Sequence, residues 1–181
     1  ALVIEGPPGT GRRTLARALG AALLCTQPVD GDACGGCESC RLLAADNHPD
    51  AVVLPGDTER AEIPVDMIRE RVVDPASETP LVGARRVFVL PGAERLRGPA
   101  ANVLLKVLEE PPAGVHLMMT AIQAGGLLPT IQSRSQVIRL QSLPQEQLQA
   151  VLRAGGIAPE EARRRSAIGG GSHRALWGRG V

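Results

Sequence analysis

One stretch near the amino terminus decides the fold of this 181-residue chain: residues 2–15, which read LVIEGPPGTGRRTL. An apolar run is followed by a Gly/Pro-rich loop, and after the loop apolar residues recur at helical spacing. A strand, a glycine loop and a helix in this order form the architecture of a P-loop. Gly6 and Gly11 occupy the two glycine positions of the motif G-x-x-x-x-G-K-[ST]. The sequence therefore predicts a P-loop fold.

The same stretch lacks two groups that nucleotide hydrolysis needs. Arg12 replaces the lysine of the motif, and Arg13 replaces its Ser/Thr. A planar guanidinium is not equivalent to a compact ammonium between phosphates, and Arg13 has no hydroxyl for Mg²⁺. The backbone N–H groups of the loop can still attract an anion, so at most a weak anion site is expected. The residues that would form it are Gly6, Gly9, Gly11 and Arg12.

The second nucleotide motif is also altered. Residues 86–90 are apolar after the first position, which predicts a buried parallel strand. An active P-loop ATPase carries Asp-Glu after this strand, where Asp serves Mg²⁺ and Glu activates water. Here Pro91 and Gly92 follow, and we predict that the nearby Glu94 is a surface residue. Thr120, at the end of the next predicted strand, is either a nucleotide sensor or an ordinary strand-end hydroxyl.

The four cysteines of the chain have the spacing C-x8-C-x2-C-x2-C. Four thiolates suit tetrahedral Zn²⁺, and a four-cysteine site has no open position for a substrate, so structural zinc is predicted. Two disulfides or a redox-active C-x-x-C pair are the alternatives, but nothing in the sequence indicates secretion. His48 is predicted to be a loop residue, because the cysteines complete the ligand set. The predicted ligands are Cys25, Cys34, Cys37 and Cys40.

The rest of the pattern predicts a three-layer α/β domain with a parallel sheet, followed by a small helical domain. Strands are predicted at 50–54, 86–90, 116–120 and 136–140, after the first strand of the P-loop. Helices are predicted up to residue 24, from 64 through 73, at 99–110, 127–133, 145–153 and 159–167, and from Ser172 onward. The predicted core spans 1–141 with a zinc module at 25–40, and the helical domain spans 142–181.

Bulk composition excludes few functions. The net charge of +1 argues neither for nor against nucleic acid. Phe88 and Trp177 are the only aromatic residues, so a platform of stacked bases is not expected. No apolar run approaches the length of a membrane span, and no signal peptide is visible. Because the chain starts without Met and opens directly on a strand, we expect that natural N-terminal residues are missing.

Four features together resemble a known family. They are the cysteine spacing, the helix NVLLKVLEEPP at 102–112, the segment LPTIQSRS at 128–135 and the segment GSHRAL at 171–176. The chain resembles the delta-prime subunits of bacterial DNA polymerase III clamp loaders, which are AAA+ proteins. The related gamma/tau subunits keep both nucleotide motifs, so delta-prime is the better match. Ser135 stands where the family has Cys, and the family's helical collar domain lies beyond this chain.

The resemblance implies a function within a complex. A delta-prime subunit is a non-hydrolysing stator that helps load a sliding clamp onto primed DNA during replication. It would bind gamma/tau and delta subunits in the bacterial cytoplasm, with ATP only at the interface of a neighbouring subunit. Arg134 would act in trans as an arginine finger on that ATP, with its pairing to a local carboxylate as the alternative. The chain would then not be an enzyme by itself.

Three other functions were weighed. A gamma/tau-like ATPase is disfavoured by the missing Asp-Glu pair. A P-loop phosphotransferase is disfavoured more strongly, because Arg12 and Arg13 replace the catalytic positions of the loop. A zinc-stabilised scaffold with no nucleotide role stays open.

Overall fold

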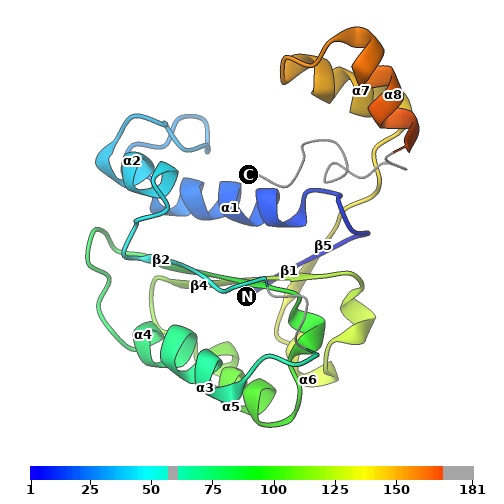
Figure 1. Cartoon of the computed structure of the whole chain (residues 1–181). Helices are drawn as coiled ribbons and strands as arrows, with labels where there is room; N and C mark the ends of the chain where they lie inside the picture. Colours follow the sequence, from blue (N-terminus) through cyan, green and yellow to red (C-terminus); the bar gives the residue numbers. More distant parts are fainter. Residues whose placement is uncertain (57–60, 169–181) are drawn as a thin grey trace.

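The computed structural model describes residues 1–56 and 61–168 and is built on one parallel sheet (Figure 1). The strand order is β2-β3-β4-β1-β5, and every neighbouring pair is parallel. The predicted α/β class with a parallel sheet is confirmed. The strands are β1 (Leu2–Glu5), β2 (Ala51–Val53), β3 (Arg86–Pro91), β4 (Val115–Ala121) and β5 (Gln136–Arg139).

Helices cover both faces of the sheet, which gives the three predicted layers (Figure 1). One face carries α1 (Arg12–Leu24) and α2 (Glu38–Ala44). The other face carries α3 (Val65–Ile68), α4 (Asp74–Ala76), α5 (Gly98–Glu109) and α6 (Pro129–Gln132). Two short 3₁₀ helices, Ala93–Arg95 and Ala124–Gly126, follow β3 and β4.

Strand β3 shows why the central strands read as continuous apolar runs. Successive side chains of a strand point to opposite faces of the sheet. Phe88 and Leu90 enter the core beneath α3 and α5, whereas Val87 and Val89 enter the core beneath α1. Because helices cover both faces, neither set of positions can be polar.

The predicted helix from residue 64 through residue 73 is interrupted. Pro64 precedes it as the N-cap, α3 ends at Ile68, and a π-helical turn follows at Arg69–Val73. The next helical segment, α4, contains Pro75. Proline has no backbone N–H to donate, so the regular hydrogen-bond pattern cannot pass through Pro75. The wider turn before α4 accommodates this lost donor.

A buried ion pair ties β2 to β3 at the edge of the sheet. The side chains of Asp50 and Arg86 are 0% and 4% exposed, and Arg86 Nη2 lies 3.1 Å from Asp50 Oδ1. The carboxylate also accepts hydrogen bonds from the backbone N–H groups of Leu81 and Val82, each at 2.8 Å at the shortest. Thr79 accepts a hydrogen bond from Arg86 through its carbonyl. The pair therefore fixes the loop that leads into β3.

The last described helices form a cluster of their own. Helices α7 (Gln145–Ala154) and α8 (Pro159–Ile168) lie apart from the sheet in Figure 1. They bury Leu148, Leu152 and Ala162 against each other. The predicted helix from Ser172 and the segment 171–176 lie outside the described residues.

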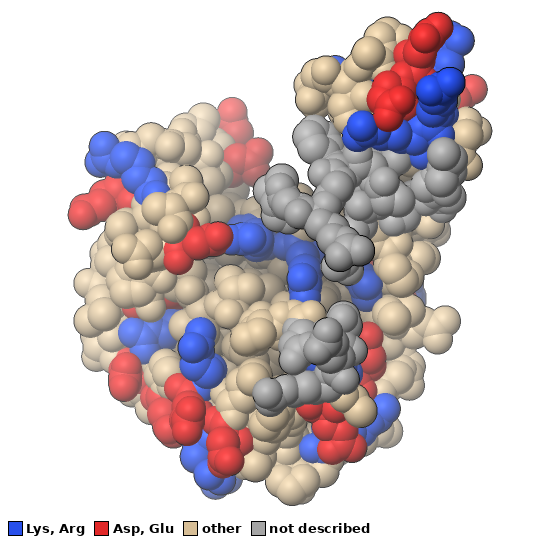
Figure 2. All heavy atoms as spheres, in the orientation of Figure 1, with Lys and Arg blue, Asp and Glu red and all other residues tan. Residues whose placement is uncertain are grey.

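The visible surface carries charges of both signs. Figure 2 shows acidic and basic side chains interspersed around the sheet domain and on the part formed by α7 and α8. This agrees with the net charge of +1. Among the helices in the described residues, none is both long enough and apolar enough to pass through a lipid bilayer.

Candidate functional site

The four cysteines come together in a compact cluster between α1 and α2. Their sulfur atoms all lie within 4.8 Å of one another. Cys25 Sγ and Cys37 Sγ are 3.9 Å apart, and Cys34 Sγ and Cys40 Sγ are 4.0 Å apart. These separations are about twice the ~2.05 Å length of a disulfide bond. They suit four sulfur ligands at about 2.3 Å around a common tetrahedral ion, so the cluster could hold a metal.

The local chain arrangement directs N–H groups at the sulfur atoms. The backbone N–H of Cys34 donates to Cys25 Sγ at 3.3 Å, and that of Cys40 donates to Cys37 Sγ at 3.4 Å. The Thr26 hydroxyl and then these backbone donors lower the pKa of Cys37 to about 5. Burial raises the pKa of Cys40 to about 12. A bound cation would compensate the cost of ionising this buried thiol.

A buried hydrogen-bond chain fastens the cysteine cluster to the sheet domain. His48 lies in the predicted loop, but its side chain is buried. Its Nδ1 accepts a hydrogen bond from the Asp50 N–H at 3.0 Å, and its Nε2 lies 2.9 Å from the Ser39 hydroxyl. That hydroxyl donates in turn to the Leu24 carbonyl at 2.7 Å. His48 therefore holds α2 against the end of α1, a role the sequence pattern did not indicate.

The P-loop has the predicted strand–loop–helix form. A Cβ atom at Gly6 would lie 2.7 Å from the Leu140 carbonyl oxygen and 2.8 Å from Thr10 Oγ1, so only glycine fits. Gly11 is the N-cap of α1 with φ 86°, in the left-handed region that glycine adopts without strain. Within the described residues no side chain caps this helix start. Its first N–H groups are thus available to an anion.

Two side chains of the loop differ from those of an active site. The Arg12 side chain is partly buried, and this burial lowers the pKa of its guanidinium, while the Glu94 carboxylate acts in the opposite sense. The prediction that Glu94 is a surface residue is wrong: it is half-buried, and its Oε2 is buried without a hydrogen-bond partner in the described part of the chain. A carboxylate beside the loop opposes the binding of a phosphate.

Neither Arg13 nor Thr120 offers a group to a nucleotide. The Arg13 guanidinium occupies the space where a Cβ of Gly56 would lie, so it packs beyond the end of β2. Thr120 is buried, and its hydroxyl accepts a hydrogen bond from the Gly92 N–H at 3.3 Å. This hydroxyl joins the ends of β3 and β4. The hollow beside the loop, about 360 Å³, is lined mainly by apolar residues: Gly9, Thr10, Gly11, Thr14, Leu15, Ala18, Leu140 and Leu143.

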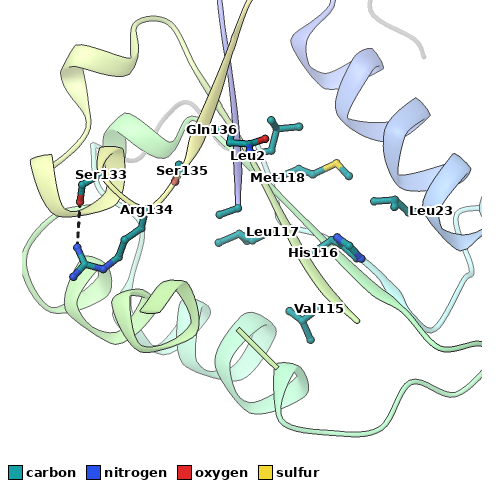
Figure 3. Close-up of a pocket in the computed structure, with 11 residues that line it drawn as sticks. Leu2, Leu23, Val115, His116, Leu117, Met118, Ser133, Arg134, Ser135 and Gln136 are labelled. Carbon is teal, nitrogen blue, oxygen red and sulfur yellow. Dashed lines mark hydrogen bonds between the residues drawn. The ribbon is translucent and has the colours of Figure 1, made fainter. Parts of the chain in front are cut away.

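Arg134 lies at the opposite edge of the sheet from the P-loop. It precedes β5, whereas the loop follows β1, and these two strands run parallel. Arg134 lines an open pocket of about 600 Å³, together with His116, Leu117 and Ser133. Figure 3 shows its side chain extending away from His116 and Leu117, beside the Ser133 hydroxyl. Its Nη2 also forms an ion pair with Glu109 Oε1 at 2.9 Å.

This geometry defines the class of protein. A parallel sheet in the order β2-β3-β4-β1-β5, with a glycine loop between β1 and α1, is a P-loop domain of the AAA+ class. A solved gamma-subunit-related protein of DNA polymerase III from Thermotoga maritima has the same fold, with a TM-score of 0.59 at 23% identity. That match covers 84% of this chain and 44% of the solved chain.

The chain belongs to the family described as DNA polymerase III, delta subunit, whose sequence model matches residues 1–144. Subunit delta' of DNA polymerase III from Pseudomonas aeruginosa is 43% identical over 134 residues, which make up 74% of this chain and 40% of the relative. Subunit gamma/tau from Mycobacterium bovis is 33% identical over 152 residues, 84% of this chain and 26% of the relative. The chain thus spans less than half the length of these relatives.

Proposed function

We propose that this chain is part of a clamp-loader subunit that does not hydrolyse ATP and instead supplies Arg134 to the ATP of a neighbouring subunit. Family membership and the likeness to delta' subunits support the assignment to a clamp loader. The proposed neighbours are gamma/tau and delta subunits, and the proposed substrates of the whole complex are a sliding clamp and primed DNA. Helices α7 and α8 would begin the lid domain.

One observation carries the role in trans: Arg134 and the P-loop of the same chain lie at opposite edges of the sheet. Arg134 therefore cannot reach a phosphate bound at its own loop. An arginine is always charged and can contact two phosphate oxygens at once, which suits it to a phosphate presented by another subunit. The altered loop, with Arg12 and Glu94 beside it, removes the reason for a catalytic arginine in cis.

We further propose that the four cysteines hold structural zinc. A four-thiolate set with sulfur atoms within 4.8 Å of one another suits tetrahedral Zn²⁺ and leaves no position for a substrate. The ion would secure the segment between α1 and α2, which the described hydrogen bonds fasten elsewhere only through Ser39 and His48. In this proposal the metal contributes to folding and takes no part in ATP hydrolysis.

The test is Arg134→Ala in a complex reconstituted with gamma/tau and delta subunits. An arginine supplied in trans contributes about 10³- to 10⁵-fold to the rate in other P-loop systems, so a loss of at least about ten-fold in DNA- and clamp-stimulated ATP hydrolysis is expected. Arg69→Ala is the matched control, because Arg69 is also exposed and ion-paired but lies on the π-helical turn. Normal hydrolysis and clamp loading by the Arg134 variant would refute the proposal.

A further inference from the structure

Arg134 is held in place by three acceptors of its own chain. Besides the ion pair of Nη2 with Glu109 at 2.9 Å, its Nη1 donates to the Thr130 carbonyl and to the Ser133 hydroxyl, each at 3.2 Å. Thr130 and Ser133 belong to α6 and its C-cap, whereas Glu109 is the last residue of α5. Two separate elements therefore determine where the guanidinium lies.

These contacts leave part of the guanidinium unused. A guanidinium has five N–H donors, two on each Nη and one on Nε. The three contacts take both donors of Nη1 and one donor of Nη2. Within the described residues, the Nε–H and the second Nη2–H of Arg134 have no acceptor. The side chain is 37% exposed, so these donors can meet a group from outside the chain.

The position of Glu109 is not explained by the stability of its own helix. It lies in the last turn of α5, where the helix dipole is negative and a carboxylate is unfavourable. Lys106 is the basic residue of that turn. No backbone N–H accepts Glu109 as a cap, and its described side-chain partner is Arg134. The carboxylate at this point is thus compensated by the arginine from the β5 side.

We infer that Glu109 is a positioning residue for Arg134: it orients the guanidinium so that its remaining donors face the nucleotide of the neighbouring subunit. The inference rests on the proposed function in trans. Glu109 is the only charged group among the three acceptors, so it contributes the strongest contact. Because the pair is exposed, its loss corresponds to a change of about 2- to 5-fold in an equilibrium constant.

The experiment measures ATP hydrolysis by the reconstituted complex as a function of ATP concentration. It compares Glu109→Ala, Glu109→Gln and the control Glu110→Ala, each with and without Arg134→Ala. Glu110 is adjacent, exposed and equally charged, and the structure shows no ion pair for it in the described residues. Glutamine keeps an acceptor oxygen without the charge, so it should restore part of the activity if an acceptor at this point orients Arg134.

We expect Glu109→Ala to lower kcat about 2- to 5-fold with a smaller change in KM, and Glu109→Gln to lower it less. In the Arg134→Ala background, Glu109→Ala should have no further effect, because the residue acts through the arginine. An effect equal to that of Glu110→Ala, or an equal loss in both backgrounds, would overturn the inference while the role of Arg134 stands. A silent Arg134→Ala would instead refute the proposed function, and the inference with it.

Discussion

The buried ion pair between Asp50 and Arg86 should be one of the largest single contributions to the stability of this domain. The substitution Asp50→Asn keeps the size of the side chain but removes its charge. It leaves the Arg86 guanidinium, 4% exposed, without its carboxylate, and it turns an amide toward the N–H groups of Leu81 and Val82. No cavity forms, so the loss reports the interactions of the carboxylate rather than packing.

The magnitude follows from the burial of both partners. Removing one member of a buried pair costs about 3–5 kcal/mol, because the other charge is left uncompensated. For a domain of this size, each kcal/mol shifts the melting temperature by about 2–4 °C, so a decrease of about 6–20 °C is expected. Glu78→Gln is the control, since Glu78 also pairs with Arg86 but is 70% exposed. That pair should contribute at most about 1 kcal/mol.

The assay is urea unfolding of both variants, with the slope of the transition checked against wild type. Burial alone raises the pKa of Asp50, but the N–H groups of Val82 and Leu81 and the charge of Arg86 together lower it below its ordinary value. A lowered folded-state pKa gives stability that is present above about pH 4 and is lost as the pH falls through the folded value. The difference between wild type and Asp50→Asn should therefore shrink in acid. A loss below about 1 kcal/mol at pH 7 would refute the reasoning.

Two further predictions concern the cysteine cluster and the P-loop. Metal analysis should find about one zinc per chain, and Cys40→Ser should lower both the zinc content and the free energy of unfolding, as for other closed four-thiolate sites; a folded, metal-free protein with two disulfides would contradict this. The purified chain should show no Mg²⁺-dependent ATP hydrolysis, because Arg12, Arg13 and Pro91 stand at positions that need a lysine, a hydroxyl and a carboxylate. Steady turnover of ATP by the pure chain would instead support a gamma/tau-like ATPase.

Several features of the molecule follow from the local pattern of residues. The apolar run of β3 predicts a strand buried on both faces, because covered strands cannot carry polar residues at alternate positions. The spacing of the glycines predicts the P-loop, since Gly6 and Gly11 serve a turn whose sterics exclude a Cβ or whose φ is positive. The cysteine spacing predicts one cluster, because short loops keep all four sulfur atoms within reach of a single ion.

Other features depend on which elements the fold places side by side. Glu109 meets Arg134 because α5 ends beside the turn that precedes β5, and no periodicity links these two positions. His48 meets Ser39, and Asp50 meets Arg86, through loops whose conformation the sequence pattern does not specify. The sequence alone thus determined the layers, the cysteine ligand set and the missing groups of the P-loop, because helical and strand periods and tight turns are local. Only the tertiary structure decided the partners of the charged and polar side chains, because those contacts depend on how distant segments pack around the sheet.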